Sequence, residues 1–180
     1  MRYNDKSVLE NFHVATALSV MNDPNYNVFE YFTNGQNKLM RESLVNVVLS
    51  TDPVFHSEML AQFNQQVDNG KRKRLNQLLG KLDFTQKGDV ENTMGLIMHI
   101  CDVSNSAKPL PIYYKWVELL FVEFFDQGDR EKSLSLKPSM LCDRDTTNIA
   151  KAQVGFIDFI IKPAFVSLSR FLDGMDAYLA

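Results

Sequence analysis

The sequence of 180 residues contains only two cysteines, Cys101 and Cys142. Two thiols cannot build a disulfide framework, and neither cysteine stands in a CxxC pair that would indicate a zinc knuckle. We therefore expect both thiols to be reduced. Long apolar runs are missing too, because the most hydrophobic stretches are interrupted by charge, and residues 1–10 lack the apolar region of a signal peptide. The sequence thus predicts a cytoplasmic protein without a membrane segment.

The short motifs that identify several enzyme classes are also absent. The chain has no glycine-rich phosphate loop, no GxSxG elbow and no HExxH motif, so nucleophilic and P-loop chemistry find no support. Its 19 basic and 22 acidic residues give a net charge of −3. That balance argues against a protein built to neutralise nucleic-acid phosphates or to lie on an anionic membrane. We expect no nucleic-acid partner.

Strand signals are scarce, and apolar residues recur instead at helical spacing. We therefore predict an all-α chain. With 45% hydrophobic residues, a chain of this length can bury a sizeable core in one compact domain. We expect a first helix of about four turns after Ser7, and a last one after Pro163. The other expected helices cover residues 28–32, 37–50, 53–67, 90–104, 112–127 and 148–161.

Several residues mark where helices should begin and end. Ser7 and Glu10 have the spacing of a capping box, in which each side chain satisfies a free backbone N–H. Pro53 indicates a helix start, and Gly128 a helix end. Residues 68–89 contain three glycines and a short basic run, which fits either a nuclear-import or nucleic-acid signal or a solvated loop. We interpret them as a loop.

One carboxylate, Asp102, lies in an otherwise apolar stretch. A buried acid there would need a partner or a cation, although Asp102 could equally lie on the solvent face of an amphipathic helix. His99 precedes it by three residues, and such a pair on one helix face can hold a divalent metal. Ser104 and Asn105, which follow, could be helix caps or ligand contacts.

Four ordered blocks of sequence resemble one protein family, the class I cyclic nucleotide phosphodiesterases. The blocks are YNDKSVLENFH at 3–13, STDPVFHSEML at 50–60, CDVSNSAKP at 101–109, and EFFDQGDREK with MLCDRDTTNIAKAQVGFIDFIIKP within 123–163. The resemblance implies that residues 1–180 form a compact, multi-helix domain like the C-terminal part of the HD-type phosphodiesterase catalytic domain, apart from the loop at 68–89.

By this resemblance Asp102 is a metal ligand, whereas His99 does not fall on a ligand position. Glu10 matches an acid that hydrogen-bonds metal-bound water, a role that competes with the capping box. Thr51 and Asp52 match a hydroxyl and an acid placed behind the metal-bound waters. Asp52 could also be only a helix N-cap before Pro53.

The resemblance also implies a nucleotide pocket. Gln153 matches the glutamine that binds the purine edge, and Phe156 the aromatic residue that stacks on the base. The two share a helix face at this spacing, although by itself Phe156 would be read as a core residue. The remaining pocket positions are Val103, Asn105, Tyr113, Val117, Leu120 and Leu141. Among them, Asn105 is expected to orient Gln153.

The activity implied by the resemblance is hydrolysis of cAMP or cGMP to the 5′-monophosphate by a hydroxide held between two divalent ions, zinc and magnesium or manganese. The family's His-Asn-x-x-His and His-Asp-x-x-His motifs lie ahead of the Tyr3 block, and the sequence contains neither. We therefore expect a C-terminal portion of the enzyme that is inactive alone and prone to self-association. The alternative is a helical binding or dimerisation module without catalysis. Preference between the two nucleotides stays open.

Overall fold

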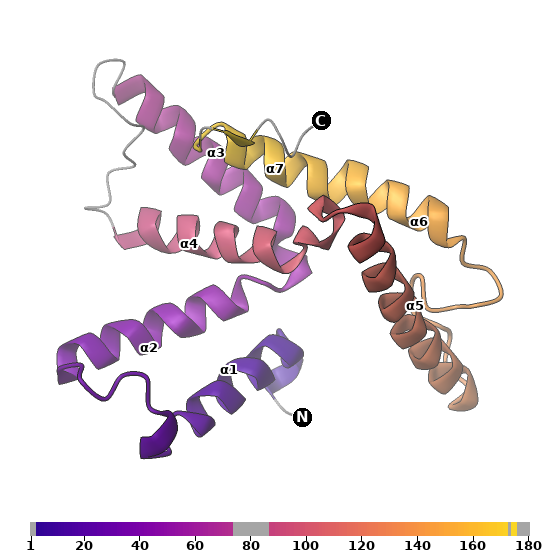
Figure 1. Cartoon of the computed structure of the whole chain (residues 1–180), viewed down its shortest axis with the longest axis horizontal. Helices are drawn as coiled ribbons and strands as arrows, with labels where there is room; N and C mark the ends of the chain where they lie inside the picture. Colours follow the sequence, from indigo (N-terminus) through magenta and orange to yellow (C-terminus); the bar gives the residue numbers. More distant parts are fainter. Residues whose placement is uncertain (1–2, 74–86, 173, 176–180) are drawn as a thin grey trace. The chain divides into compact units, whose positions relative to one another are not determined.

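Helices are the regular secondary structure in the part of the chain that the structure describes. The computed structural model covers residues 3–73, 87–172 and 174–175, with no β-strand among them, and so confirms the all-α prediction (Figure 1). The α-helices are α1 (Val8–Val20), α2 (Asn34–Leu49), α3 (His56–Lys73), α4 (Lys87–Asp102), α5 (Leu110–Ser133), α6 (Ile149–Phe156) and α7 (Lys162–Ser169). Within these residues, no helix has the length and apolar character needed to cross a membrane.

The chain divides into two compact units, which we describe separately. Unit 1 comprises Met1–Asp102 with Arg170–Leu172, and unit 2 comprises Val103–Ser169 with Asp173–Ala180. In unit 1, α2 packs against both α1 and α4, and α4 packs against α3. Its buried apolar side chains face inward from all four helices: Val14, Val47, Leu60, Phe63, Val67, Leu96 and Ile100.

Unit 2 is built around α5. Tyr113, Val117 and Phe121 recur on one face of this helix and are buried together, and Ala152 and Ile157 pack against them. Helix α6 continues through a π-helical turn, Ile157–Ile161, into α7 (Figure 1). The wider turn lies just before Pro163, whose ring lacks the N–H and would crowd a regular α-helix at the preceding turn.

The predicted capping box at Ser7 and Glu10 is wrong. Ser7 has a left-handed backbone (φ 43°) and makes no cap bond, because its hydroxyl donates instead to the Asp52 carboxylate at 2.7 Å. A capping box does occur at the start of α2, where Thr33 and Gln36 bond reciprocally.

Two other sequence expectations need correction. Residues 28–32 form turns rather than a helix, because the Asn27 side chain accepts a hydrogen bond from the Phe29 N–H at 2.9 Å and stabilises a turn there. Of the loop expected at 68–89, residues 68–73 continue α3 and 87–89 begin α4. The middle of that segment lies outside the described residues.

Gly128 does not end a helix, since α5 continues to Ser133. It is buried, and a Cβ atom on it would lie 1.9 Å from the Cys142 carbonyl oxygen. The glycine is therefore needed for close approach of the connection between α5 and α6 to the α5 backbone.

Candidate functional site

Asp52 is the best-connected acid of the predicted site in unit 1. It follows the end of α2, and one of its carboxylate oxygens accepts the Val54 N–H at 2.9 Å, so it caps the 3₁₀ helix Pro53–Phe55. The other oxygen accepts the Ser7 hydroxyl at 2.7 Å. Asp52 thus joins the start of α1 to the turn between α2 and α3, as an N-cap and as a contact to α1.

The two neighbours predicted to act with Asp52 are half-buried. The Thr51 hydroxyl donates to the Val48 carbonyl at 2.8 Å, which ties this side chain to the last turn of α2. Glu10 lies in the first turn of α1, three residues after Ser7. Because the Ser7 hydroxyl is used by Asp52, Glu10 is not engaged in a reciprocal cap.

Asp102 is the last residue of α4 and is exposed. Its position agrees with the solvent-face alternative rather than with a buried acid. Across the described part of the chain, no three His, Cys, Asp or Glu side chains converge in a way that could hold a metal ion. Catalytic zinc sites use about three protein ligands, so these residues do not make a complete metal site, and Asp102 supplies one carboxylate at most.

His99 is buried against His56, and this contact does not support a metal site shared by His99 and Asp102. It is 1% exposed, and its Nε2 atom lies 2.9 Å from Nδ1 of His56, which is 5% exposed. Burial lowers the pKa of both imidazoles, and the His99 ring lowers that of His56 further. The pair is therefore neutral and buried.

Gln153 in unit 2 is held by a tyrosine. The Tyr113 hydroxyl donates to Oε1 of Gln153 at 2.8 Å, joining α5 to α6. Burial raises the pKa of Tyr113, so this hydroxyl keeps its proton at neutral pH. The structure assigns the anchoring of Gln153 to Tyr113, whereas the sequence predicted Asn105, which makes no such bond among the described residues.

The other predicted pocket residues surround this hydrogen bond to different degrees. Val117 is buried in the α5 core, and Phe156 and Leu120 are half-buried. Asn105 belongs to the 3₁₀ helix Ser104–Ala107, which Val103 precedes and which packs against the π-helical turn that follows Phe156. Leu141 is exposed and has a left-handed backbone (φ 67°).

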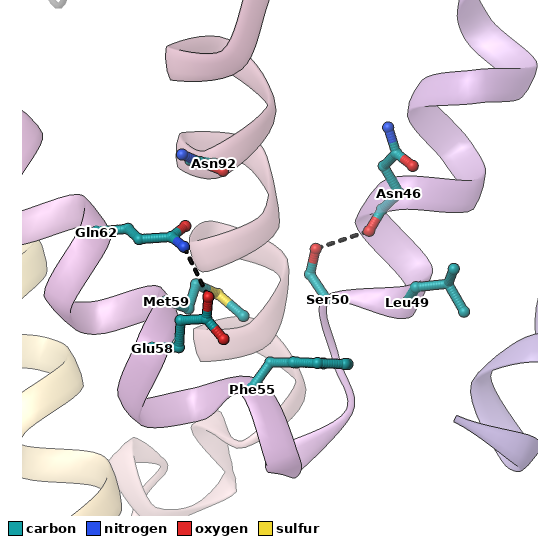
Figure 2. Close-up of a pocket in the computed structure, with 8 residues that line it drawn as sticks. All are labelled: Asn46, Leu49, Ser50, Phe55, Glu58, Met59, Gln62 and Asn92. Atoms are coloured by element: carbon teal, nitrogen blue, oxygen red, sulfur yellow. Dashed lines mark hydrogen bonds between the residues drawn. The ribbon is translucent and has the colours of Figure 1, made fainter. Parts of the chain in front are cut away.

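A surface pocket of unit 1 lies beside the Thr51 turn. Its volume is about 310 Å³, and side chains from α2, α3 and α4 line it (Figure 2). Amide groups of Asn46, Gln62 and Asn92 and the Glu58 carboxylate give it a polar wall. Gln62 donates to Glu58 at 3.0 Å. None of the residues predicted from the sequence lines this pocket, although Ser50 adjoins Thr51.

A comparison with protein-family models decides the family. The model for 3'5'-cyclic nucleotide phosphodiesterase matches residues 1–180. The chain belongs to this family. Over 163 residues it is 39% identical to the 3',5'-cyclic-AMP phosphodiesterase 4C of Rattus norvegicus, a match that covers 91% of this chain and 30% of that protein.

Other phosphodiesterases of the family match in the same way. Identity is 40% over 165 residues to the 3',5'-cyclic-AMP phosphodiesterase, isoform F, of Drosophila melanogaster, covering 91% of this chain and 24% of the relative. It is 36% over 172 residues to the probable 3',5'-cyclic phosphodiesterase pde-1 of Caenorhabditis elegans, covering 96% and 24%. The chain therefore spans less than a third of the length of these phosphodiesterases.

Sequence reasoning missed the His56–His99 pair. The two histidines are 43 positions apart, and the signal in the sequence is that each stands among apolar residues on the inward face of its helix. Their contact depends on how α3 and α4 cross, which spacing along the chain does not specify.

Proposed function

We propose that this chain is a C-terminal portion of a phosphodiesterase catalytic domain and contributes the purine-binding part of a site that hydrolyses 3′,5′-cyclic nucleotides. The family match over residues 1–180 carries this proposal. The Tyr113–Gln153 hydrogen bond supports it, because a buried hydroxyl fixes an amide that could otherwise rotate.

Gln153 and Phe156 are proposed to bind the base. They lie at i and i+3 on α6, so the amide can hydrogen-bond a purine edge while the ring contacts its face. Tyr113 occupies one lone pair of Oε1, which leaves a second lone pair and both N–H groups for the base. The names of the rat and fruit-fly relatives support cAMP as the substrate.

Asp102 is proposed as one ligand among several for the divalent ions on which the family depends, zinc and magnesium or manganese. Hydrogen bonds to the metal-bound water molecules are proposed for three further residues, Glu10, Thr51 and Asp52. Since the described residues do not form a complete metal site, we propose that the chain alone does not hydrolyse cyclic nucleotides.

Self-association of the isolated chain is proposed from the apolar side chains exposed on unit 1. Leu9 and Phe12 on α1, and Tyr26, Val28 and Tyr31 after it, are between 47% and 92% exposed. Clusters of large exposed apolar groups favour association. A cytoplasmic location is proposed from the scarcity of cysteine, since two thiols are too few for the disulfide framework of a small secreted domain.

Nucleotide binding to the chain tests the proposed base pocket. Calorimetric titration with 5′-AMP should show saturable binding that Gln153→Ala and Phe156→Leu each weaken by about tenfold, equivalent to about 1.4 kcal/mol. Matched control variants are Gln127→Ala on α5 and Phe159→Leu, whose ring is 78% exposed on the π-helical turn. Equal losses in the control variants, or no saturable binding by the wild type, would reject the pocket and favour a helical module without nucleotide chemistry.

A further inference from the structure

Two buried histidines join the elements that carry the acids of unit 1. His56 is the first residue of α3, four positions after Asp52, and His99 lies one helical turn before Asp102 on α4. Their ring centroids are 5.1 Å apart, and Nδ1 of His56 lies 2.9 Å from Nε2 of His99. This is a direct polar link between the Thr51–Asp52 turn and the helix that ends in Asp102.

The direction of this hydrogen bond follows from the groups around it. The backbone carbonyls of Ser50 and Thr51 face His99 and favour a proton on its ring, although neither makes a well-aligned bond to Nδ1. A proton on Nδ1 of His99 leaves Nε2 as an acceptor, because a neutral imidazole carries one N–H. His56 must then donate through its Nδ1–H.

The end of α2 is also pressed against α4 beside this pair. A Cβ atom on Gly95, one turn before His99, would lie 2.5 Å from the Ser50 hydroxyl oxygen. The turn that contains Thr51 and Asp52 is thus in close contact with α4 at Gly95 and bonded to it through His56. The Ser50 side chain fills the space beside Gly95, and the directional imidazole bond constrains how the turn is rotated.

We propose that the His56–His99 pair positions the Thr51–Asp52 turn relative to Asp102. The two imidazoles are neutral, and their hydrogen bond links α3 to α4. The inference rests on the proposed function for the roles of Asp52 and Asp102, whereas the link itself is a property of unit 1. His56 and His99 are positioning residues, since both act through the backbone that carries the acids.

The link requires a neutral pair. The charged group that acts on His99 is Asp102, which favours protonation of the ring, as do the carbonyls at the end of α2. The titratable group that acts on His56 is His99. Burial outweighs these groups and lowers both pKa values from 6.5. The unfolded chain therefore binds more protons below pH 6.5, so the stabilisation is complete above that pH and is lost as the pH falls below it.

Measurements on the wild-type chain test the pair without any substitution. Nitrogen-15 spectra of the histidine rings at pH 7.5 should show His99 as the Nδ1–H tautomer and His56 with its Nδ1–H in a hydrogen bond. Denaturant unfolding should show stability falling between pH 7 and pH 5.5, and His13→Asn, on the exposed face of α1, should leave that slope unchanged. A rapidly averaging tautomer mixture at both rings would overturn the proposal.

Native-state hydrogen exchange separates positioning from general core stability. The Val54 N–H bonds to the Asp52 carboxylate and the Phe55 N–H to the Asp52 carbonyl, so both report on the turn. His56→Asn keeps a donor close to the Nδ1 position, whereas His56→Leu removes it. We expect Val54 and Phe55 to lose protection at least tenfold in His56→Leu but not in His56→Asn.

The control variant for this experiment is Phe63→Leu, which changes a fully buried ring of α3 away from the turn. Protection factors are compared after subtraction of each variant's global unfolding free energy. A larger loss of amide protection at Val54 and Phe55 in His56→Leu than in Phe63→Leu supports positioning of the turn. An equal loss of protection in both variants would show that the pair contributes packing alone. Neither readout requires nucleotide or metal, so failure here leaves the proposed function to its own test.

Discussion

At the scale of single residues, Ser7 illustrates how a side chain can have a different partner from the one that its local sequence predicts. Its backbone is left-handed, so the hydroxyl is directed away from the first turn of α1 and reaches Asp52 across 45 positions of sequence. Asp52 then holds a helix cap and a tertiary contact with its two oxygens. The acid proposed to serve the metal site is thereby fixed in orientation.

A pair of double-mutant cycles tests this assignment. Ser7→Ala combined with Asp52→Ala should give a coupling energy of about 1–2 kcal/mol, because a hydrogen bond to a charged group is lost. Ser7→Ala combined with Glu10→Ala should give a coupling near zero. Urea unfolding of the wild type, the three single variants and the two double variants provides the energies. A larger coupling energy of Ser7 with Glu10 than with Asp52 would contradict this assignment and support the capping box.

At the scale of elements, the connection at residues 134–148 is held on α5 by close contact and by charge. Lys132 bonds to Asp143 at 2.6 Å and to Asp145 at 2.7 Å, and Glu131 accepts from the Ser139 N–H and hydroxyl at 2.6 and 2.7 Å. This segment carries Leu141, one of the proposed pocket residues. The position of that part of the pocket therefore depends on surface contacts.

Gly128 is the steric part of this attachment. Gly128→Ala should destabilise the chain by about 1–3 kcal/mol, since the new Cβ overlaps the Cys142 carbonyl and the connection must move. The matched change Gly35→Ala, in the open first turn of α2, should instead be neutral or stabilise by up to about 1 kcal/mol. Thermal unfolding measures both. Equal effects would show that Gly128 has no packing role.

Acid should loosen the same connection. Hydrogen bonds from Ser139 lower the pKa of Glu131 below 4.5, and the bond from Lys132 lowers that of Asp143 below 3.8. Because both carboxyl groups titrate lower when folded, their contribution is present above those values and is lost as the pH falls through them. The protection factor of the Ser139 amide should fall between pH 5 and pH 3. Glu131→Gln should reduce this dependence, and Glu123→Gln, a matched change on α5, should not.

The sequence predicted the helical elements better than their ends. Apolar spacing identified the regions of α2 to α6, since burial of one face is a local, periodic signal. It did not predict that α5 extends through Gly128, because the reason for that glycine is a contact with Cys142 far along the chain. Nor did it predict the turn at Asn27 or the π-helical turn before Pro163, which depend on single hydrogen bonds and on ring geometry.

At the scale of the whole molecule, the site residues identified by resemblance fall into two groups that belong to different units. Asp102, Thr51, Asp52 and Glu10 lie in unit 1, and the proposed base pocket lies in unit 2. The resemblance predicts both groups, but the residues that hold others in place, Tyr113 and the His56–His99 pair, are evident only from contacts between helices. Such contacts are absent from any short motif.

These residues are proposed to complete a phosphodiesterase when they are joined to further metal ligands. The most direct measurement is cAMP turnover by a chimera in which the part of the fruit-fly isoform F preceding its matching region is fused ahead of this chain. We predict turnover with zinc and magnesium present, reduced more than about 100-fold by Asp102→Asn and unchanged by Glu118→Gln on α5. Turnover that persists in Asp102→Asn would contradict the proposed role of Asp102 as a metal ligand.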